Sequence, residues 1–121
     1  MQSIELHEDE DLLVLSFVDR KITDDKRITQ IDADLQEATG LAGNGRVLVD
    51  FTGLNFMSSA MVGALLRFQK KCDGASINVK FCNIGDAVGE IFQVMKLKKI
   101  FSIHKTREDA VKAYTKKGWF G

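Results

Sequence analysis

The sequence contains no proline, and no stretch rich in serine and glycine separates one part of it from another. Linkers between domains are typically exposed segments rich in Pro, Gly or polar residues, so this composition offers no boundary. With 121 residues, 45% of them hydrophobic, the chain is long enough to bury a core of its own. We therefore predict a single domain over residues 1–121.

Cysteine and histidine are scarce. Cys72 and Cys82 are too few for a disulfide framework or for a zinc site with about four ligands, and they are predicted to be small buried hydrophobic residues. His7 and His104 have no patterned acids nearby, and neither HExxH nor GxSxG occurs. The glycine-rich segment 40–45 lacks the Lys-Ser/Thr of a phosphate-binding loop. No enzymatic activity, metal or cofactor is predicted.

Long apolar runs are also missing. None approaches the roughly 20 residues needed to cross a bilayer. The first ten residues, MQSIELHEDE, lack the order of a basic and then an apolar region that marks a signal peptide. We expect a soluble cytoplasmic protein with no membrane span.

Neither sign of charge is in excess, because 17 Lys and Arg balance 17 Asp and Glu. The two signs of charge are nevertheless distributed unevenly along the chain. Residues 1–50 hold five basic and twelve acidic residues, a net charge of −7, so residues 51–121 carry +7. Such polarity steers charged partners, but it is not the uniformly basic pattern of a nucleic-acid-binding protein. No nucleic-acid partner is predicted.

The sequence does contain alternating strand and helix patterns. Residues 4–7 and 12–18 are short apolar segments separated by the polar tetrad EDED, which predicts an antiparallel hairpin. Thr23 is predicted to cap a helix that opens with Asp24 and Asp25, where the helix dipole favours acids. The apolar face of this helix recurs every three or four positions, at Ile28, Ile31, Leu35 and Ala38.

The remaining segments continue this alternation. RVLVDF at 46–51 predicts a strand buried on both faces, and 77–82 and 100–103 predict two more strands. Thr106 and Asp109 resemble a capping box for a last helix that closes at Gly118. Three later helices are predicted from their apolar residues, which are Met61, Leu65, Phe68 and Cys72 on one side of an amphipathic helix, then Val88, Ile91, Phe92 and Met95, then Ala110, Ala113 and Tyr114. The order predicts an α/β fold, with a mixed sheet of about four or five strands and helices mainly on one face.

Asp50 ends the central predicted strand, where doubly wound proteins place their chemistry. A response-regulator receiver is phosphorylated on such an aspartate, and Asp24 and Asp25 would offer its acidic pair for magnesium. The opening hairpin does not fit a receiver, which begins with a parallel strand–helix unit. We favour an Asp50 that bonds local backbone amides and keep the receiver as an alternative.

Two serines, Ser58 and Ser59, stand between the central strand and the next helix. Serine is a favoured N-cap residue, and a cap alone stabilises a helix by about 1 kcal/mol. The same place suits a phosphate, because the first backbone N–H groups of a helix lack partners within the helix. Capping and phosphorylation are compatible, so position alone leaves both open.

The segment DFTGLNFMSSAMVGALL, residues 50–66, resembles the central segment of the STAS domain family of bacterial anti-sigma factor antagonists. The opening hairpin and INVKFCNIGDAVGEIFQVMKLKKIF, residues 77–101, are similar to the rest of that family's pattern. Ser58 stands at the family's aspartate, Ala60 at its second serine and Met61 at its glycine. The family also has an acidic residue shortly after its second strand, and this chain has Lys21 and Thr23 near that position instead.

This resemblance implies the STAS fold and a non-catalytic interaction module. Ser59 falls on the serine that anti-sigma kinases phosphorylate, and Ser58 is the cap or a second acceptor. The implied partner is an anti-sigma factor serine kinase, which supplies ATP and magnesium. The alternative within the family is a subunit that docks on a transporter ATPase without being phosphorylated.

The partner-binding residues are predicted to lie around the start of the helix, at Thr52, Asn55, Met57, Ser58, Ser59, Met61 and Val62. Phe56 is predicted to face the core and Met57 to lie at the rim. At the other end of the chain, Trp119 and Phe120 either pack back on the sheet or offer an apolar surface to a second copy, forming a homodimer.

Overall fold

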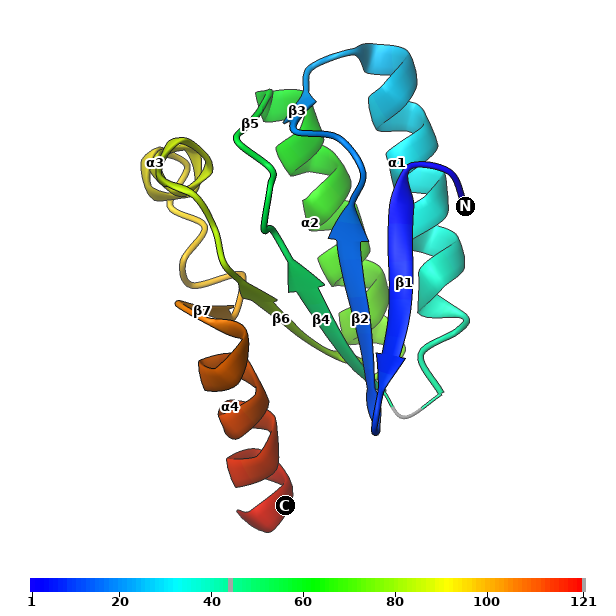
Figure 1. Ribbon diagram of the computed structural model, residues 1–121, viewed down its shortest axis with the longest axis vertical. Coiled ribbons are helices and arrows are strands. Elements are labelled where there is room, and N and C mark those ends of the chain that lie inside the picture. The colour runs from blue at the N-terminus through cyan, green and yellow to red at the C-terminus, as the bar shows by residue number, and fades with distance from the viewer. Residues whose placement is uncertain (44, 121) are drawn as a thin grey trace.

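The computed structural model describes residues 1–43 and 45–120, with side chains up to Tyr114, and shows a five-stranded sheet with helices on both faces (Figure 1). In chain order the elements are β1 (Ile4–Asp9), β2 (Leu12–Phe17), β3 (Lys21–Ile22), α1 (Asp25–Thr39), β4 (Arg46–Asp50), β5 (Phe56–Met57), α2 (Ser59–Gly74), β6 (Asn78–Cys82), α3 (Asp86–Val94), β7 (Ile103–His104) and α4 (Arg107–Phe120). No helix within the described ranges has the length and apolar character that a bilayer crossing requires.

The sheet has the order β1-β2-β4-β6-β7. β1 and β2 form the predicted antiparallel hairpin, and the other neighbouring pairs are parallel. The hairpin pairs as far as Asp9, so its turn is tighter than the tetrad suggested, with Glu10 at a positive φ of 56°. The last strand is shorter than predicted and begins only at Ile103.

A second, two-stranded sheet was not predicted. β3 and β5 pair in parallel just before the starts of α1 and α2. The Asn55 N–H donates to the Arg20 carbonyl (2.7 Å) and the Ser58 N–H to the Ile22 carbonyl (2.9 Å). Two-residue strands are too short to show a hydrophobic period, but these bonds place the starts of both helices at the same end of the molecule.

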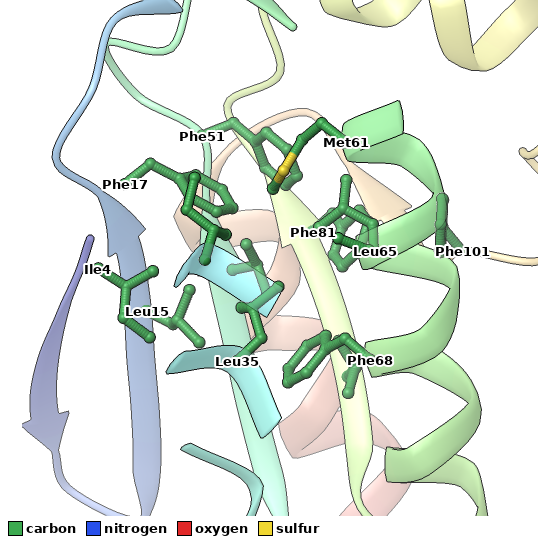
Figure 2. Close-up of a cluster of buried hydrophobic side chains, with 14 of the residues drawn as sticks. Ile4, Leu15, Phe17, Leu35, Phe51, Met61, Leu65, Phe68, Phe81 and Phe101 are labelled. Carbon is green, nitrogen blue, oxygen red and sulfur yellow. The ribbon is translucent and has the colours of Figure 1, made fainter. Parts of the chain in front are cut away.

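The larger core lies between the sheet and α1, α2 and α3 (Figure 2). Phe51 is its centre on the sheet, with ring centroids 5.3 Å from Phe17 and 5.1 Å from Phe81, and Phe81 lies 4.6 Å from Phe101. Full burial of one such side chain stabilises the fold by roughly 1.5–3 kcal/mol. The strand residues that face this core alternate with those that face α4, which confirms that the central strands are buried on both faces.

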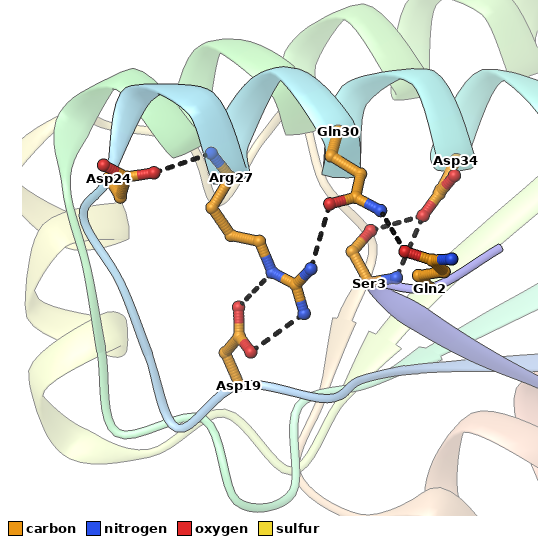
Figure 3. Close-up of polar contacts among 7 residues, drawn as sticks. All are labelled: Gln2, Ser3, Asp19, Asp24, Arg27, Gln30 and Asp34. Carbon is orange, nitrogen blue, oxygen red and sulfur yellow. Dashed lines mark hydrogen bonds and ion pairs between the residues drawn. The ribbon is translucent and has the colours of Figure 1, made fainter.

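Polar contacts fix the N-terminal strand and the loop after β2 against α1 (Figure 3). Asp24, rather than the predicted Thr23, caps the helix, because its carboxylate accepts from the Arg27 N–H (3.0 Å). The Arg27 guanidinium pairs with Asp19 (2.7 and 3.0 Å). Burial opposes ionisation of Asp34, but hydrogen bonds from the Ser3 hydroxyl and N–H outweigh it and lower the pKa of the Asp34 carboxyl.

Helix α4 covers the opposite face of the sheet. Ala110 and Tyr114 pack on Val14, Leu48 and Cys82, and the Tyr114 hydroxyl donates to the Val47 and Asn78 carbonyls. The Thr106 hydroxyl accepts from the Asp109 N–H (3.1 Å), as expected for a helix start. The helix runs to Phe120 and does not end at Gly118. The predicted roles of Trp119 and Phe120 concern side chains outside the described part.

Both cysteines are buried, as predicted. Burial raises the pKa of each thiol to about 12, with the neighbouring carboxylates of Asp73 and Asp50 adding to the effect at Cys72 and Cys82 respectively.

Candidate functional site

The site is the segment that links β4 to α2. Asp50 ends β4, and its Oδ1 accepts from the Thr52 N–H (3.0 Å), the Thr52 hydroxyl (2.7 Å) and the Asn83 side-chain amide (3.1 Å). Gly53 follows at φ 87°, a conformation that side-chain-bearing residues rarely adopt. These contacts turn the chain away from the sheet, and the local role expected of Asp50 is confirmed.

The ionisation of Asp50 reflects those contacts. Burial disfavours the charged form, but the hydrogen bonds from Thr52 and Asn83, with a smaller effect of the Arg107 charge, hold the pKa of the carboxyl below its usual value. The ionised Asp50 carboxylate therefore stabilises the loop through the hydrogen bonds that it accepts from Thr52 and Asn83.

The receiver alternative finds no support in the structure. Its sheet would begin with a parallel unit, whereas β1 and β2 are antiparallel. Asp24, one of the two acids considered for magnesium, caps α1. Across residues 1–43 and 45–120, no three His, Cys, Asp or Glu side chains come together in a way that could hold a metal ion.

Ser58 occupies the N-cap position of α2, but its hydroxyl makes no capping bond. The Met61 N–H reaches the Ser58 carbonyl instead (3.1 Å). The Ser58 hydroxyl oxygen is buried, and none of the described residues offers it a hydrogen bond. Ser58 therefore occupies the predicted cap position, but the predicted hydrogen bond from the helix to its side chain is absent.

Ser59 is the first residue of α2, and unlike Ser58 it is exposed. The first turn of the 16-residue helix contains no acidic residue, so no carboxylate there offsets the positive end of the helix dipole. The backbone N–H groups in the first turn of a helix lack partners within the helix, so this exposed residue stands where an anion is favoured.

The predicted contact residues divide into two groups. Thr52, Asn55 and Ser59 are exposed and Ser58 is partly so. Met57, Met61 and Val62 are fully buried, so they support the loop and the helix from below and do not form its rim.

The predictions for Phe56 and Met57 are wrong, because the side chain of Met57 faces the core and that of Phe56 is exposed. Met57 has no exposed surface, whereas Phe56 is 42% exposed. The cause is the small β3–β5 sheet, in which Met57 pairs with the buried Ile22 and successive side chains point to opposite faces.

One side of the site was missed by the sequence analysis altogether. α3 lies beside β5 (Figure 1), and a shallow groove between them reaches Ser59. We call it the α3–Ser59 groove; its lining residues are Phe56, Ser59, Ala87, Glu90, Ile91, Val94 and Met95. Of the apolar residues that marked this helix, Met95 is exposed, whereas Ile91 is partly buried against the main core and also lines the groove. The sequence did contain a signal for this surface, because α3 has more apolar residues than one face of a helix can bury.

Comparison with known proteins agrees with this geometry. The family model of the STAS domain matches residues 4–110. No curated protein matches the chain.

Solved structures resemble it closely in shape. An anti-sigma factor antagonist (STAS) domain protein from Planctomyces limnophilus has a TM-score of 0.80 at 21% identity, covering 91% of this chain and 96% of its own. The Bacillus cell fate determinant SpoIIAA in its phosphorylated form has a TM-score of 0.66 at 19% identity, covering 92% and 98%. The murine anion transporter Slc26a9 has a TM-score of 0.72 at 13% identity, covering 87% of this chain and 18% of its own. The chain belongs to the STAS domain family.

Proposed function

We propose that this protein is an anti-sigma factor antagonist, a non-catalytic module that acts on transcription in the bacterial cytoplasm. In its unmodified form it binds an anti-sigma factor serine kinase through the surface around Ser59. Phosphorylation of Ser59 by that kinase ends the binding. The kinase brings ATP and magnesium, so this chain needs no cofactor.

The observation that carries the proposal is the difference between the two serines. Ser59 is an exposed residue at the start of α2, whereas the Ser58 hydroxyl oxygen is buried. Solved relatives with this fold include anti-sigma factor antagonists, and one of them is a phosphorylated form. Of the two acceptors considered, Ser59 is therefore the one we propose.

The physical effect of the phosphate differs between the protein and its complex. In the free protein, a phosphate at an exposed helix start gains roughly 0.3–1 kcal/mol from the dipole. Beneath a docked partner, about 1.5–2 negative charges lose their water. Unpaired burial of such charge costs several kcal/mol, and each 1.4 kcal/mol weakens binding tenfold.

The similarity to a transporter favours a second candidate function, that of a docking subunit. In Slc26a9 the matching region is 18% of the chain, so a domain of this shape also forms part of a transporter. A docking subunit without phosphorylation would use the same surface without modification of Ser59.

The test is a labelling experiment with each anti-sigma serine kinase of the source genome, purified and supplied with ATP and magnesium. We expect one kinase to phosphorylate the wild type and the Ser58→Ala variant but not Ser59→Ala. Label that persists in Ser59→Ala, or no label with any kinase, would contradict the proposal. A hydroxylamine-sensitive label after incubation with acetyl phosphate would instead identify Asp50 as the acceptor.

A further inference from the structure

Helix α3 is apolar on two sides. Val88 and Phe92 are buried in the core, as expected for a helix that covers a sheet. Ala87, Ile91 and Val94 follow at i, i+4 and i+7 on another side of the helix, and they line the α3–Ser59 groove. A surface helix normally has a polar outer face, so an apolar face here indicates that something else covers it.

The groove gathers several exposed apolar side chains in one place. Val94 is 79% exposed, and Phe56 and Met95 are each 42% exposed. Single exposed apolar residues are ordinary, but a contiguous group beside polar residues marks an interaction surface. Phe56 comes from β5 and the others from α3 and its end, so the surface depends on the folded arrangement.

We propose that the α3–Ser59 groove receives an apolar side chain of the kinase partner, flanked on that partner by a lysine or arginine that pairs with Glu90. This proposal rests on the function proposed above and adds the chemistry of the contact. Val94, Ile91 and Phe56 hold the apolar group, and Glu90 selects the basic neighbour.

Charge favours a different protein over a second copy as the occupant. Among the described residues that line the groove, Glu90 carries the one formal charge. A two-fold contact places the same patch of both copies together, which would bring the two Glu90 carboxylates close to each other. Like charges across an interface disfavour association, whereas a basic group on a partner is complementary.

The position of Ser59 connects this groove with the switch. Ser59 lines the same groove as Ile91 and Val94. A phosphate there would stand at the edge of the surface from which the partner's apolar group must displace water. The contact and the phosphate therefore exclude each other.

The test measures binding of the purified kinase that phosphorylates the wild type, by calorimetry without ATP. Val94→Asp is the main variant, and Leu41→Asp is its matched control, since Leu41 is 51% exposed and lies outside the groove. We expect Val94→Asp to weaken binding about tenfold or more, as loss of one buried apolar side chain would. Leu41→Asp should bind as the wild type does.

A charge series tests the second half of the proposal. Glu90→Lys should weaken binding more than Glu90→Gln, because it repels the partner's basic group. Urea unfolding of every variant checks that the fold is intact, and Val94→Ser replaces Val94→Asp if the latter is unstable.

Wild-type affinity in Val94→Asp, or equal affinities of Glu90→Lys and Glu90→Gln, would overturn the groove proposal while the switch at Ser59 stands. If none of the kinases binds or phosphorylates the wild type, both proposals fail. A dimer of the wild type in sedimentation that Val94→Asp dissociates, with kinase binding unchanged, would assign the groove to a second copy and overturn the proposal as well.

Discussion

At the scale of single residues, Ser58 and Ser59 are chemically identical neighbours with different surroundings. Ser58 donates its N–H to the Ile22 carbonyl of β3 and accepts from the Met61 N–H of α2, while its hydroxyl oxygen is buried without a bond from any described residue. Ser59 begins the helix and faces outward. Ser58 therefore has a structural role through its backbone bonds, and Ser59 is the exposed serine of the pair.

This difference gives a stability prediction. A serine cap that bonds the helix contributes about 1 kcal/mol. Because the Ser58 side chain makes no such bond, Ser58→Ala should leave the free energy of unfolding within about 0.5 kcal/mol of the wild type. Asp24→Ala should lower it by about 1 kcal/mol, since Asp24 does bond the Arg27 N–H. Urea denaturation measures both, and equal losses would show that the Ser58 hydroxyl caps after all.

Asp50 gives a pH-dependent prediction. Its pKa is lowered in the folded protein, so its stabilising effect is complete above the unfolded value near 3.8 and is lost as the pH falls through the lower folded value. Asp50→Asn keeps an acceptor oxygen for Thr52 but has no charge, and should cost about 1 kcal/mol at pH 7.

The difference between wild type and Asp50→Asn should shrink steadily below about pH 3.8. Urea unfolding at a series of pH values measures it. A difference that stays constant down to pH 2 would mean that the charge of Asp50 does not contribute.

At the scale of elements, the side chains described up to Tyr114 place α4 on a smaller apolar cluster than the one beneath the other helices. Among those described side chains, the cluster on the α4 face has five buried residues, whereas the main core continues through α1, α2 and α3. Helices with fewer buried contacts open more often without global unfolding.

The two cysteines report on this difference. Both thiols are buried and have pKa values of about 12, so they react only after the protein opens. Cys82 lies under α4 and Cys72 in the main core. In the single-thiol variants Cys72→Ala and Cys82→Ala, a thiol reagent at pH 8 should label Cys82 faster than Cys72. Equal rates would mean that α4 opens only with the whole fold.

The elements also show what the sequence could and could not predict. The strand at 46–51 and the face of α1 were predictable, because β-branched runs and a period of three to four residues depend on local sequence. The β3–β5 pairing was not, since it joins two-residue segments far apart in the chain. The error at Phe56 and Met57 follows from that pairing, whereas the outer face of α3 could have been inferred from the apolar composition of that helix. The resemblance led to Ser59, but only the packing separated it from Ser58.

At the scale of the whole molecule, the division of charge along the chain is only partly a division in space. The β1–β2 hairpin and α1 lie on one side, and β7, α3 and α4 lie on the other (Figure 1). α2 comes from the basic part of the chain but packs against α1, where Arg67 pairs with Asp32 (2.8 Å).

Ser59 belongs to the end where β3, β5 and the starts of α1 and α2 meet. There the loops are fixed by backbone bonds and by the contacts of Asp50, so a new charge at the surface has little of the fold to disturb. Under the proposed function, phosphorylation of Ser59 would therefore change binding without changing the fold.

The most direct measurement compares unmodified protein with protein phosphorylated on Ser59, in both kinase affinity and free energy of unfolding. We predict that phosphorylation weakens binding to the kinase at least tenfold and changes the free energy of unfolding by no more than about 1 kcal/mol. Unchanged affinity, or a phosphorylated protein that unfolds much more readily than the unmodified one, would contradict the account.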